Sequence, residues 1–172
     1  DALIGYKQYL GFADAKKTTE YKNINYNIAY SYFKQKEYDQ AADYFQKQID
    51  ANTSDRVRTS DSYLRIGDCR FVTTKYWPAM DAYNKVIEMK GFDIDYAAYQ
   101  KAISYGFVGK NDRKIEDLNS FIKTYPKSQF RDDALYELGN TYLAEKKDEL
   151  ALKSYDQLIN DKNGSYSAKA NL

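Results

Sequence analysis

Residues 135–142 read Leu-Tyr-Glu-Leu-Gly-Asn-Thr-Tyr, and residues 151–155 read Ala-Leu-Lys-Ser-Tyr. Weaker copies of this unit recur along the chain: Gly139 corresponds to Ala102, Gly67 and Ala29, at steps of 37, 35 and 38 residues. A repeat of this length is typical of stacked helical hairpins. Such arrays usually offer extended binding surfaces, so the sequence directs the question of function toward binding rather than catalysis.

Local patterns support helices within each copy. Ala41, Phe45 and Ile49 recur at four-residue spacing, which places them on one face of a helix. Gly or Ala at the repeated position leaves almost no side chain between two helices, so their backbones can approach closely. Pro78 falls in the first turn of a predicted helix, and Pro126 follows a helix that it would end. No segment alternates apolar and polar residues for long enough to predict a sheet.

These residues resemble the signature of the tetratricopeptide repeat family. That signature has a large apolar residue, Leu-Gly and Tyr in a first helix, followed by Ala and an aromatic residue in a second helix. The resemblance covers essentially the whole chain, and it implies hairpins stabilised mainly by their neighbours. The fourth copy matches the signature at Leu135, Leu138, Gly139, Tyr142, Ala151 and Tyr155.

The third copy departs most from the signature. Ala102, Tyr105 and Leu118 match it. Lys101 and Lys114, however, stand where the family prefers an apolar and a small residue. We therefore expect the third hairpin to pack less tightly than the others, or with a rotated helix.

The resemblance implies an all-α fold, a right-handed superhelical α-solenoid of helix-turn-helix repeats with about ten helices. We expect one elongated domain over residues 1–172. Ala2 and Tyr6 occupy the register of a second helix, so we expect a fragment of a longer array, with degenerate caps at both ends as the alternative. The repeats are expected at 1–20 (partial), about 21–56, 57–93, 94–128 and 129–164, and 165–172 (partial).

A narrower resemblance concerns residues 121–128, Phe-Ile-Lys-Thr-Tyr-Pro-Lys-Ser, and the motif at 134–139 that follows them. This run is similar to repeats of bacterial cell-envelope proteins, such as the TolA-binding coordinator and the lipoprotein subunit of the outer-membrane β-barrel assembly machine. The resemblance implies a location in the bacterial periplasm, with the cytoplasm as the alternative.

The composition argues against nucleic acid and membranes as partners. The 26 basic and 25 acidic residues give a net charge of +1, without a long block of one sign. A nucleic-acid surface would need a basic patch. No apolar run approaches the length that crosses a bilayer, so we expect no direct membrane insertion.

The chain contains no histidine, which removes the most common general base and metal ligand. Cys69 follows Gly67 by two residues, where a small buried residue is expected, and no histidine exists to activate it as a nucleophile. The carboxylate pair Asp132/Asp133 lies near a predicted helix start, which it would stabilise. We therefore predict a protein that is not an enzyme, with no catalytic residue, cofactor or metal site.

In the family, the first helices line the concave face of the array. The resemblance therefore implies an aromatic and aliphatic binding strip, and an exposed apolar strip usually marks an interaction site. Among its residues, Tyr26, Tyr30, Tyr99 and Tyr136 are the strongest candidates for partner contacts, because tyrosine is enriched where binding energy concentrates. The predicted partner-binding residues are Tyr26, Tyr30, Phe33, Leu64, Asp68, Phe71, Tyr96, Tyr99, Ile103, Tyr136 and Asn140, and the same strip takes in Lys34, Val72, Phe107 and Leu143.

Three interpretations of this strip remain open. It holds a peptide or helix of a partner protein, or it packs against another part of the same polypeptide, or the register is shifted and several of its residues are core. The carboxylate clamp of chaperone-binding family members is not supported, because Tyr26, Tyr30 and Leu64 stand where Lys and Asn are required. We predict a non-enzymatic scaffold that binds another protein or peptide in a concave aromatic groove. The alternative is a structural spacer within a larger multi-repeat protein whose active or binding part lies outside these residues.

Overall fold

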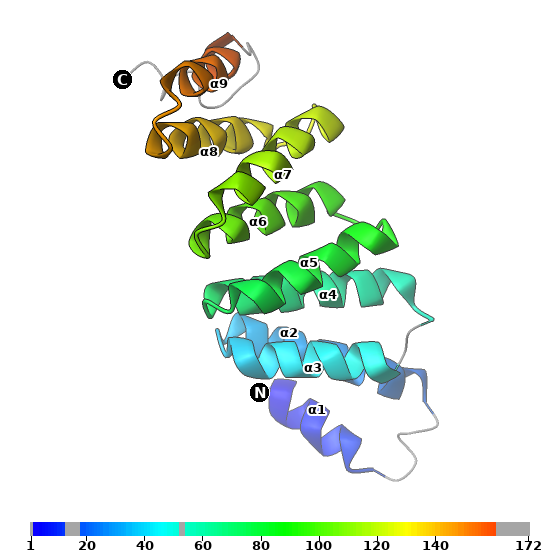
Figure 1. The fold of residues 1–172 in the computed structure, drawn as a ribbon. Coiled ribbons are helices and arrows are strands. Elements are labelled where there is room, and N and C mark those ends of the chain that lie inside the picture. Colours follow the sequence, from blue (N-terminus) through cyan, green and yellow to red (C-terminus); the bar gives the residue numbers. More distant parts are fainter. Residues whose placement is uncertain (1, 13–17, 52–53, 161–172) are drawn as a thin grey trace. The chain divides into compact units, whose positions relative to one another are not determined.

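The computed structural model describes residues 2–12, 18–51 and 54–160. These residues form α-helices and no strand, as the sequence predicts (Figure 1). The predicted partial repeat at 165–172 lies outside the described residues, which form nine helices where about ten were expected for the whole chain. The helices are α1 (Ala2–Leu10), α2 (Thr19–Lys34), α3 (Tyr38–Ala51), α4 (Arg56–Val72), α5 (Tyr76–Met89), α6 (Ile94–Phe107), α7 (Asn111–Thr124), α8 (Arg131–Ala144) and α9 (Asp148–Asn160).

Contacts between residues divide the chain into two compact units, Asp1–Ile94 and Asp95–Leu172. We call them unit 1 and unit 2. Unit 1 contains α1 to α5, and unit 2 contains nearly all of α6 together with α7 to α9. The division falls within one residue of the boundary expected between the repeats at 57–93 and 94–128. A continuous array over residues 1–172 stays a prediction.

Two glycines allow a tyrosine ring to lie directly against a helix backbone. A Cβ atom on Gly67 in α4 would lie 2.5 Å from Cε1 of Tyr83 in α5. A Cβ atom on Gly139 in α8 would lie 2.4 Å from Cε1 of Tyr155 in α9. Both distances are far below van der Waals contact, so any side chain larger than hydrogen would displace the ring. At these two positions the small residue makes room for a ring of the second helix, whereas the spacing predicted a direct approach of the two backbones.

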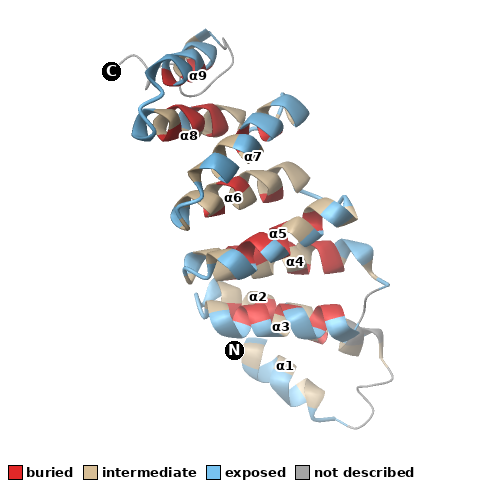
Figure 2. Cartoon of the chain, viewed as in Figure 1, coloured by how far each residue is buried: buried red, intermediate tan, exposed pale blue. Residues whose placement is uncertain are grey.

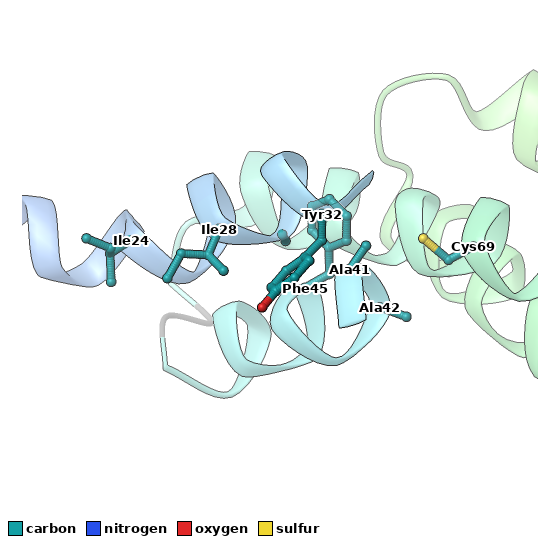
Figure 3. Close-up of a cluster of buried hydrophobic side chains, with 8 residues drawn as sticks. Ile24, Ile28, Tyr32, Ala41, Ala42, Phe45 and Cys69 are labelled. Carbon is teal, nitrogen blue, oxygen red and sulfur yellow. The ribbon is translucent and has the colours of Figure 1, made fainter. Parts of the chain in front are cut away.

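Each unit has its own apolar core, and buried residues lie along stripes of the helices while the turns are exposed (Figure 2). In unit 1 the core of α2 and α3 also takes in Cys69 (Figure 3). Burial raises the pKa of the Cys69 thiol to about 12, so the thiol stays protonated and packs as a small apolar residue. The unit 1 cluster is Ile24, Ile28, Ala29, Tyr32, Ala41, Ala42, Phe45 and Cys69, and the unit 2 cluster is Ala102, Leu118, Phe121, Ala134 and Leu138.

The two unusual lysines of the third hairpin are each paired with an acid. Lys101 Nζ lies 3.5 Å from Oδ2 of Asp117, and Lys114 Nζ lies 2.7 Å from Oε2 of Glu137. Ala102, which directly follows Lys101 in the sequence, is fully buried. The third hairpin thus keeps the small residue of the signature and accommodates the two lysines through ion pairs.

The four turns within the hairpins share one backbone conformation. A residue with positive φ occupies the same register in each: Lys36 (62°), Thr74 (58°), Gly109 (69°) and Lys146 (58°). The amide of the next residue then bonds to a carbonyl five residues back, as Lys75 does to Arg70. Such a turn satisfies carbonyl groups at the end of the first helix. Only the third hairpin uses glycine, for which a positive φ costs least.

Candidate functional site

In unit 1, the first helices α2 and α4 are joined by a shared carboxylate. The hydroxyls of Tyr26 and Tyr30 both donate to Oδ2 of Asp61 at 2.7 Å. The two rings pack edge to face, with centroids 4.9 Å apart. Burial, followed by the hydrogen bond to Asp61, raises the pKa of both phenols above the ordinary value. Both hydroxyls therefore remain donors at neutral pH.

Arg65 extends this arrangement along α4. Its Nε donates to the Tyr30 hydroxyl at 3.2 Å, and its Nη1 lies 2.7 Å from Oδ2 of Asp68. The Tyr83 hydroxyl of α5 donates to Oδ1 of Asp68 at 3.0 Å. Polar side chains that satisfy one another in this way fix the relative positions of their helices. We call the set the tyrosine–carboxylate network; its members are Tyr26, Tyr30, Asp61, Arg65, Asp68 and Tyr83.

Two predicted binding residues of unit 1 are not on its surface. Leu64 is 2% exposed and Asp68 is 9% exposed. The expectation that they lie on an exposed strip is wrong. Leu64 belongs to the buried core, which agrees with the third interpretation of the strip for this residue, and Asp68 turns inward to accept the hydroxyl of Tyr83.

The other predicted residues of unit 1 are half-buried against their own hairpins. Phe33 packs edge to face on Tyr38, and Phe71 packs in the same way on Tyr76, with centroids 5.7 and 5.5 Å apart. In each pair the second-helix tyrosine covers part of the first-helix phenylalanine. The first-helix face of unit 1 is therefore occupied largely by contacts within the unit.

In unit 2, Tyr96, Tyr99 and Ile103 on α6 are also half-buried. Phe130, which precedes α8, stacks on Tyr99 with planes 12° apart and centroids 5.6 Å apart. It also contacts Tyr96 at 5.3 Å. These tyrosines are thus brought together, as the prediction requires, but one side of their rings is covered by Phe130.

Most of the exposed apolar side chains of the predicted strip lie on unit 2, and Val72 on α4 of unit 1, at 55%, is the exception. Phe107 at the end of α6 is 58% exposed, and Tyr136 and Leu143 on α8 are 41% and 49% exposed. Large apolar side chains that remain this exposed, and lie on neighbouring elements, are typical of an interaction surface. We call these three residues the apolar rim.

A pocket of about 320 Å³ opens beside the rim, between α6, the start of α7 and α8. Its apolar walls are Ile103, Phe107 and Ala144. The Lys114–Glu137 ion pair also lines it, and the Lys114 side chain is only 12% exposed. The pocket therefore combines apolar walls with a polar wall whose two charges cancel.

Asn140 is the one predicted binding residue that lines this pocket with a hydrogen-bonding group, and it is held in place from behind. Its Oδ1 accepts a hydrogen bond of 2.7 Å from the hydroxyl of Tyr155. The Asn140 amide nitrogen donates no hydrogen bond to any described residue. That nitrogen can therefore serve a partner as a donor.

Sequence reasoning missed Asp61, Arg65 and Gly106. Asp61 and Arg65 lie four residues apart on α4, and nothing in that spacing indicates which tyrosines they meet. Gly106, which also lines the pocket, could have been found from the repeat steps. It stands in register with Phe33, Phe71 and Leu143, and it is the small member of that series.

The described residues contain no group of three or more side chains that could hold a metal ion. None of the described helices is both long enough and apolar enough to cross a membrane. The pocket between α6, α7 and α8 has apolar walls and one amide donor that no described residue uses.

Comparisons with known proteins agree with the hairpin architecture. Two family models, each described as Tetratricopeptide repeat, match residues 23–55 and residues 96–128 and 133–161. No curated protein sequence matches this chain.

Solved structures with the same fold are more distant in sequence. A crystal structure of MamA is 20% identical, with a TM-score of 0.74, and the match covers 99% of this chain and 90% of MamA. A MamA fragment from Desulfovibrio magneticus RS-1 is 13% identical, with a TM-score of 0.71 and coverage of 94% and 87%. YrrB, described as a TPR protein with an unusual peptide-binding site, is 18% identical, with a TM-score of 0.70 and coverage of 99% and 85%. At these identities the similarity shows the fold alone, whereas the family models match the sequence itself. The chain belongs to the tetratricopeptide repeat family.

Proposed function

We propose that this chain is a protein-interaction scaffold that binds a segment of another protein on the first-helix face of unit 2. Members of the tetratricopeptide repeat family are typically scaffolds of this kind. The observation that carries the proposal is the apolar rim of Phe107, Tyr136 and Leu143 beside an open pocket. The peptide-binding site named in the description of YrrB is a property of that protein, and it supports the same type of function here.

The geometry favours binding over a purely structural role for unit 2. Burying three exposed large apolar side chains against a partner would remove a substantial apolar area from water. The unpaired Asn140 amide adds a hydrogen-bond donor in the adjoining pocket. We expect affinities on the order of micromolar for a short peptide, because ordering a flexible ligand offsets much of the gain.

A second role is favoured for unit 1. Its first-helix face is joined by the tyrosine–carboxylate network and by two aromatic pairs, so fewer of its groups are available to a partner. Unit 1 therefore suits the role of a spacer that supports the binding unit.

The proposal can be tested without a known partner. Peptides are selected from a random displayed library against the full chain, and their affinities are measured by isothermal titration calorimetry. The variant Tyr136→Ala/Leu143→Ala should weaken binding at least tenfold, because each truncation removes exposed apolar contact area. Leu152→Ala is the matched control, since Leu152 is equally apolar and 63% exposed but lies on the second helix α9. Equal affinity of the double variant and the wild type would rule the proposed face out.

The compartment is a separate proposal. The resemblance of residues 121–128 to cell-envelope repeats supports the bacterial periplasm. Fractionation of cells that express the natural protein would decide it, because recovery with cytoplasmic markers contradicts the periplasmic assignment.

A further inference from the structure

A buried glutamine in unit 1 stands where the other hairpins have an apolar residue. Gln48 on α3 is 1% exposed. The same position of the second helix holds Val86, Phe121 and Leu158 in the other hairpins, and each of these is at most 2% exposed. The Gln48 amide has no hydrogen-bond partner among the described residues, at either Nε2 or Oε1. A buried amide without partners costs free energy, which a bound partner would offset.

A second polar residue stands at an apolar position of the next helix. Ser62 on α4 is fully buried. Its Oγ also lacks a hydrogen-bond partner within the part of the chain that the structure describes. The other first helices have Ile24, Ala97 and Ala134 at this position. Two consecutive helices of unit 1 thus each replace one apolar core residue with a polar one.

Other buried hydroxyls on helices of this chain bond to their own helix. Ser104 Oγ donates to the carbonyl of Gln100 at 2.7 Å, four residues back. Ser154 Oγ donates in the same way to the carbonyl of Leu150 at 2.9 Å. The Ser62 hydroxyl does not form this bond. It is therefore available, as a donor and as an acceptor, to a group outside α4.

The repeat register places Gln48 and Ser62 against each other. In unit 2 the corresponding residues, Phe121 on α7 and Ala134 on α8, belong to one core cluster. The helices α3 and α4 pack together in unit 1, as α7 and α8 do in unit 2. The polar pair therefore lies between the first and second hairpins.

The chemistry of this pair fits a small, uncharged molecule that both donates and accepts hydrogen bonds. The Gln48 amide has two N–H donors and a carbonyl acceptor, and the Ser62 hydroxyl has one donor and two lone pairs. Neither group carries a charge that could compensate the lost hydration of an ion. Both side chains are enclosed by protein, which excludes a larger ligand. A glutamine and a serine fill less volume than the phenylalanine and alanine of unit 2, by roughly the 30 Å³ that one water molecule occupies.

We propose that Gln48 and Ser62 bind an internal water molecule between the first and second hairpins of unit 1. The water hydrogen-bonds to both side chains, and buried waters with such partners are integral parts of protein structures. A polar bridge then joins α3 to α4, whereas apolar contact joins α7 to α8. This inference is independent of the proposed scaffold function, which concerns unit 2.

Nuclear Overhauser spectra of the ¹⁵N-labelled full chain test the proposal. A long-lived bound water gives cross-peaks of opposite sign in laboratory-frame and rotating-frame experiments, whereas surface water and chemical exchange give equal signs. We expect opposite signs at the Gln48 side-chain amide, whose resonance is identified by its loss in Gln48→Leu. Gln46 is the matched control, because its amide lies on the same helix, is exposed and donates to Oδ1 of Asp50 at 2.9 Å. Equal signs are expected there.

The absence of an opposite-sign water cross-peak at Gln48 overturns the proposal. A cross-peak from the Gln48 amide to the Ser62 Hβ protons, with none to water, would show that the two side chains bond to each other directly.

Variants test whether the two side chains share the water. Ser62→Ala removes one partner and introduces the residue type of unit 2, so it should shift the Gln48 side-chain resonance and weaken its water cross-peak at least twofold. Ser60→Ala is the matched control. Ser60 is also buried and lacks a partner among the described residues, but a Cβ atom on Gly91 would lie 1.7 Å from its Oγ, so this hydroxyl faces the residues after α5. Ser60→Ala should leave the Gln48 signals unchanged. Equal effects of the two variants, or no effect of Ser62→Ala, contradict the shared site.

Discussion

The two units build the same kind of hairpin but use its first-helix face differently. In unit 1, Tyr26 and Tyr30 donate to Asp61, so aromatic residues that resemble a binding strip are bound within the unit. In unit 2, Phe107 and Leu143 stay exposed next to a pocket. The difference depends on few positions of the repeat. A tetratricopeptide face can therefore change from internal bracing to exposed apolar side chains without a change of fold.

The largest expected effect comes from removing the shared carboxylate of unit 1. Asp61→Ala leaves two half-buried phenols and Arg65 without this acceptor, and hydrogen bonds to a charged group each contribute about 1.5–3 kcal/mol. We expect the free energy of unfolding to fall by about 2 kcal/mol. Urea unfolding followed by Trp77 fluorescence measures it, because the only tryptophan of the chain lies in unit 1.

Asp133 is the matched control for Asp61. It holds the same register on α8, and it has no hydrogen bond or ion pair with a described residue. Asp133→Ala should cost only about 0.5 kcal/mol, through loss of an acid in the first turn of the helix. Equal losses at Asp61 and Asp133, measured by circular dichroism, would contradict the contrast between the units.

Substitutions in the hairpin turns should change the free energy of unfolding by an intermediate amount, with opposite signs in the two units. Thr74 in unit 1 has positive φ despite its branched side chain, whereas Gly109 holds the same register in unit 2. Thr74→Gly should raise the free energy of unfolding by about 1 kcal/mol, because the backbone strain is relieved. Gly109→Thr should lower it by about 1 kcal/mol. Chemical unfolding of both variants measures the change. If both substitutions changed the free energy of unfolding in the same direction, the positive φ of the turn would not be what limits stability.

The smallest expected effect is alkaline sensitivity of unit 1. The pKa values of Tyr26 and Tyr30 are raised in the folded state, first by burial, so the folded state holds these protons more tightly than the unfolded state. Their stabilising contribution is complete below about pH 10, the ordinary pKa of tyrosine, and is lost as the pH rises beyond it.

The variant Tyr26→Phe/Tyr30→Phe removes this dependence. Between pH 8 and pH 10 the wild type should lose about 0.8 kcal/mol more than the variant. Trp77 fluorescence during urea unfolding at both pH values provides the measurement. An identical pH dependence of the two proteins would exclude the two phenols as its source.

The fold was predictable because the determining residues recur at fixed steps. Ala29, Gly67, Ala102 and Gly139 mark the small position of each first helix, and the positive-φ turns follow at a fixed distance. The order of helices follows from that register alone. The sequence reasoning also identified Cys69 as a packing residue, which agrees with its place in the core of unit 1.

The site was only partly predictable, because it depends on pairs of residues far apart in the chain. Asp61 meets Tyr26 across 35 residues, and no local pattern identifies that contact. The register places Leu64 on the binding strip, but packing in unit 1 buries it. Whether Tyr99 and Tyr136 contact a partner stays a prediction. The pocket beside Gly106 forms between α6, α7 and α8, and a single sequence does not show how three helices meet.

The contact between glycine and tyrosine in α4–α5 and α8–α9 has a consequence for how related sequences can diverge. Gly67 faces Tyr83 and Gly139 faces Tyr155, while Ala29 shares a core with Phe45 and Ala102 with Leu118. The two positions should covary among homologues, with glycine retained where a tyrosine ring lies directly on the helix backbone and alanine admitted beside phenylalanine or leucine. A substitution at one of the two positions would then be tolerated mainly in sequences in which the other position has already changed.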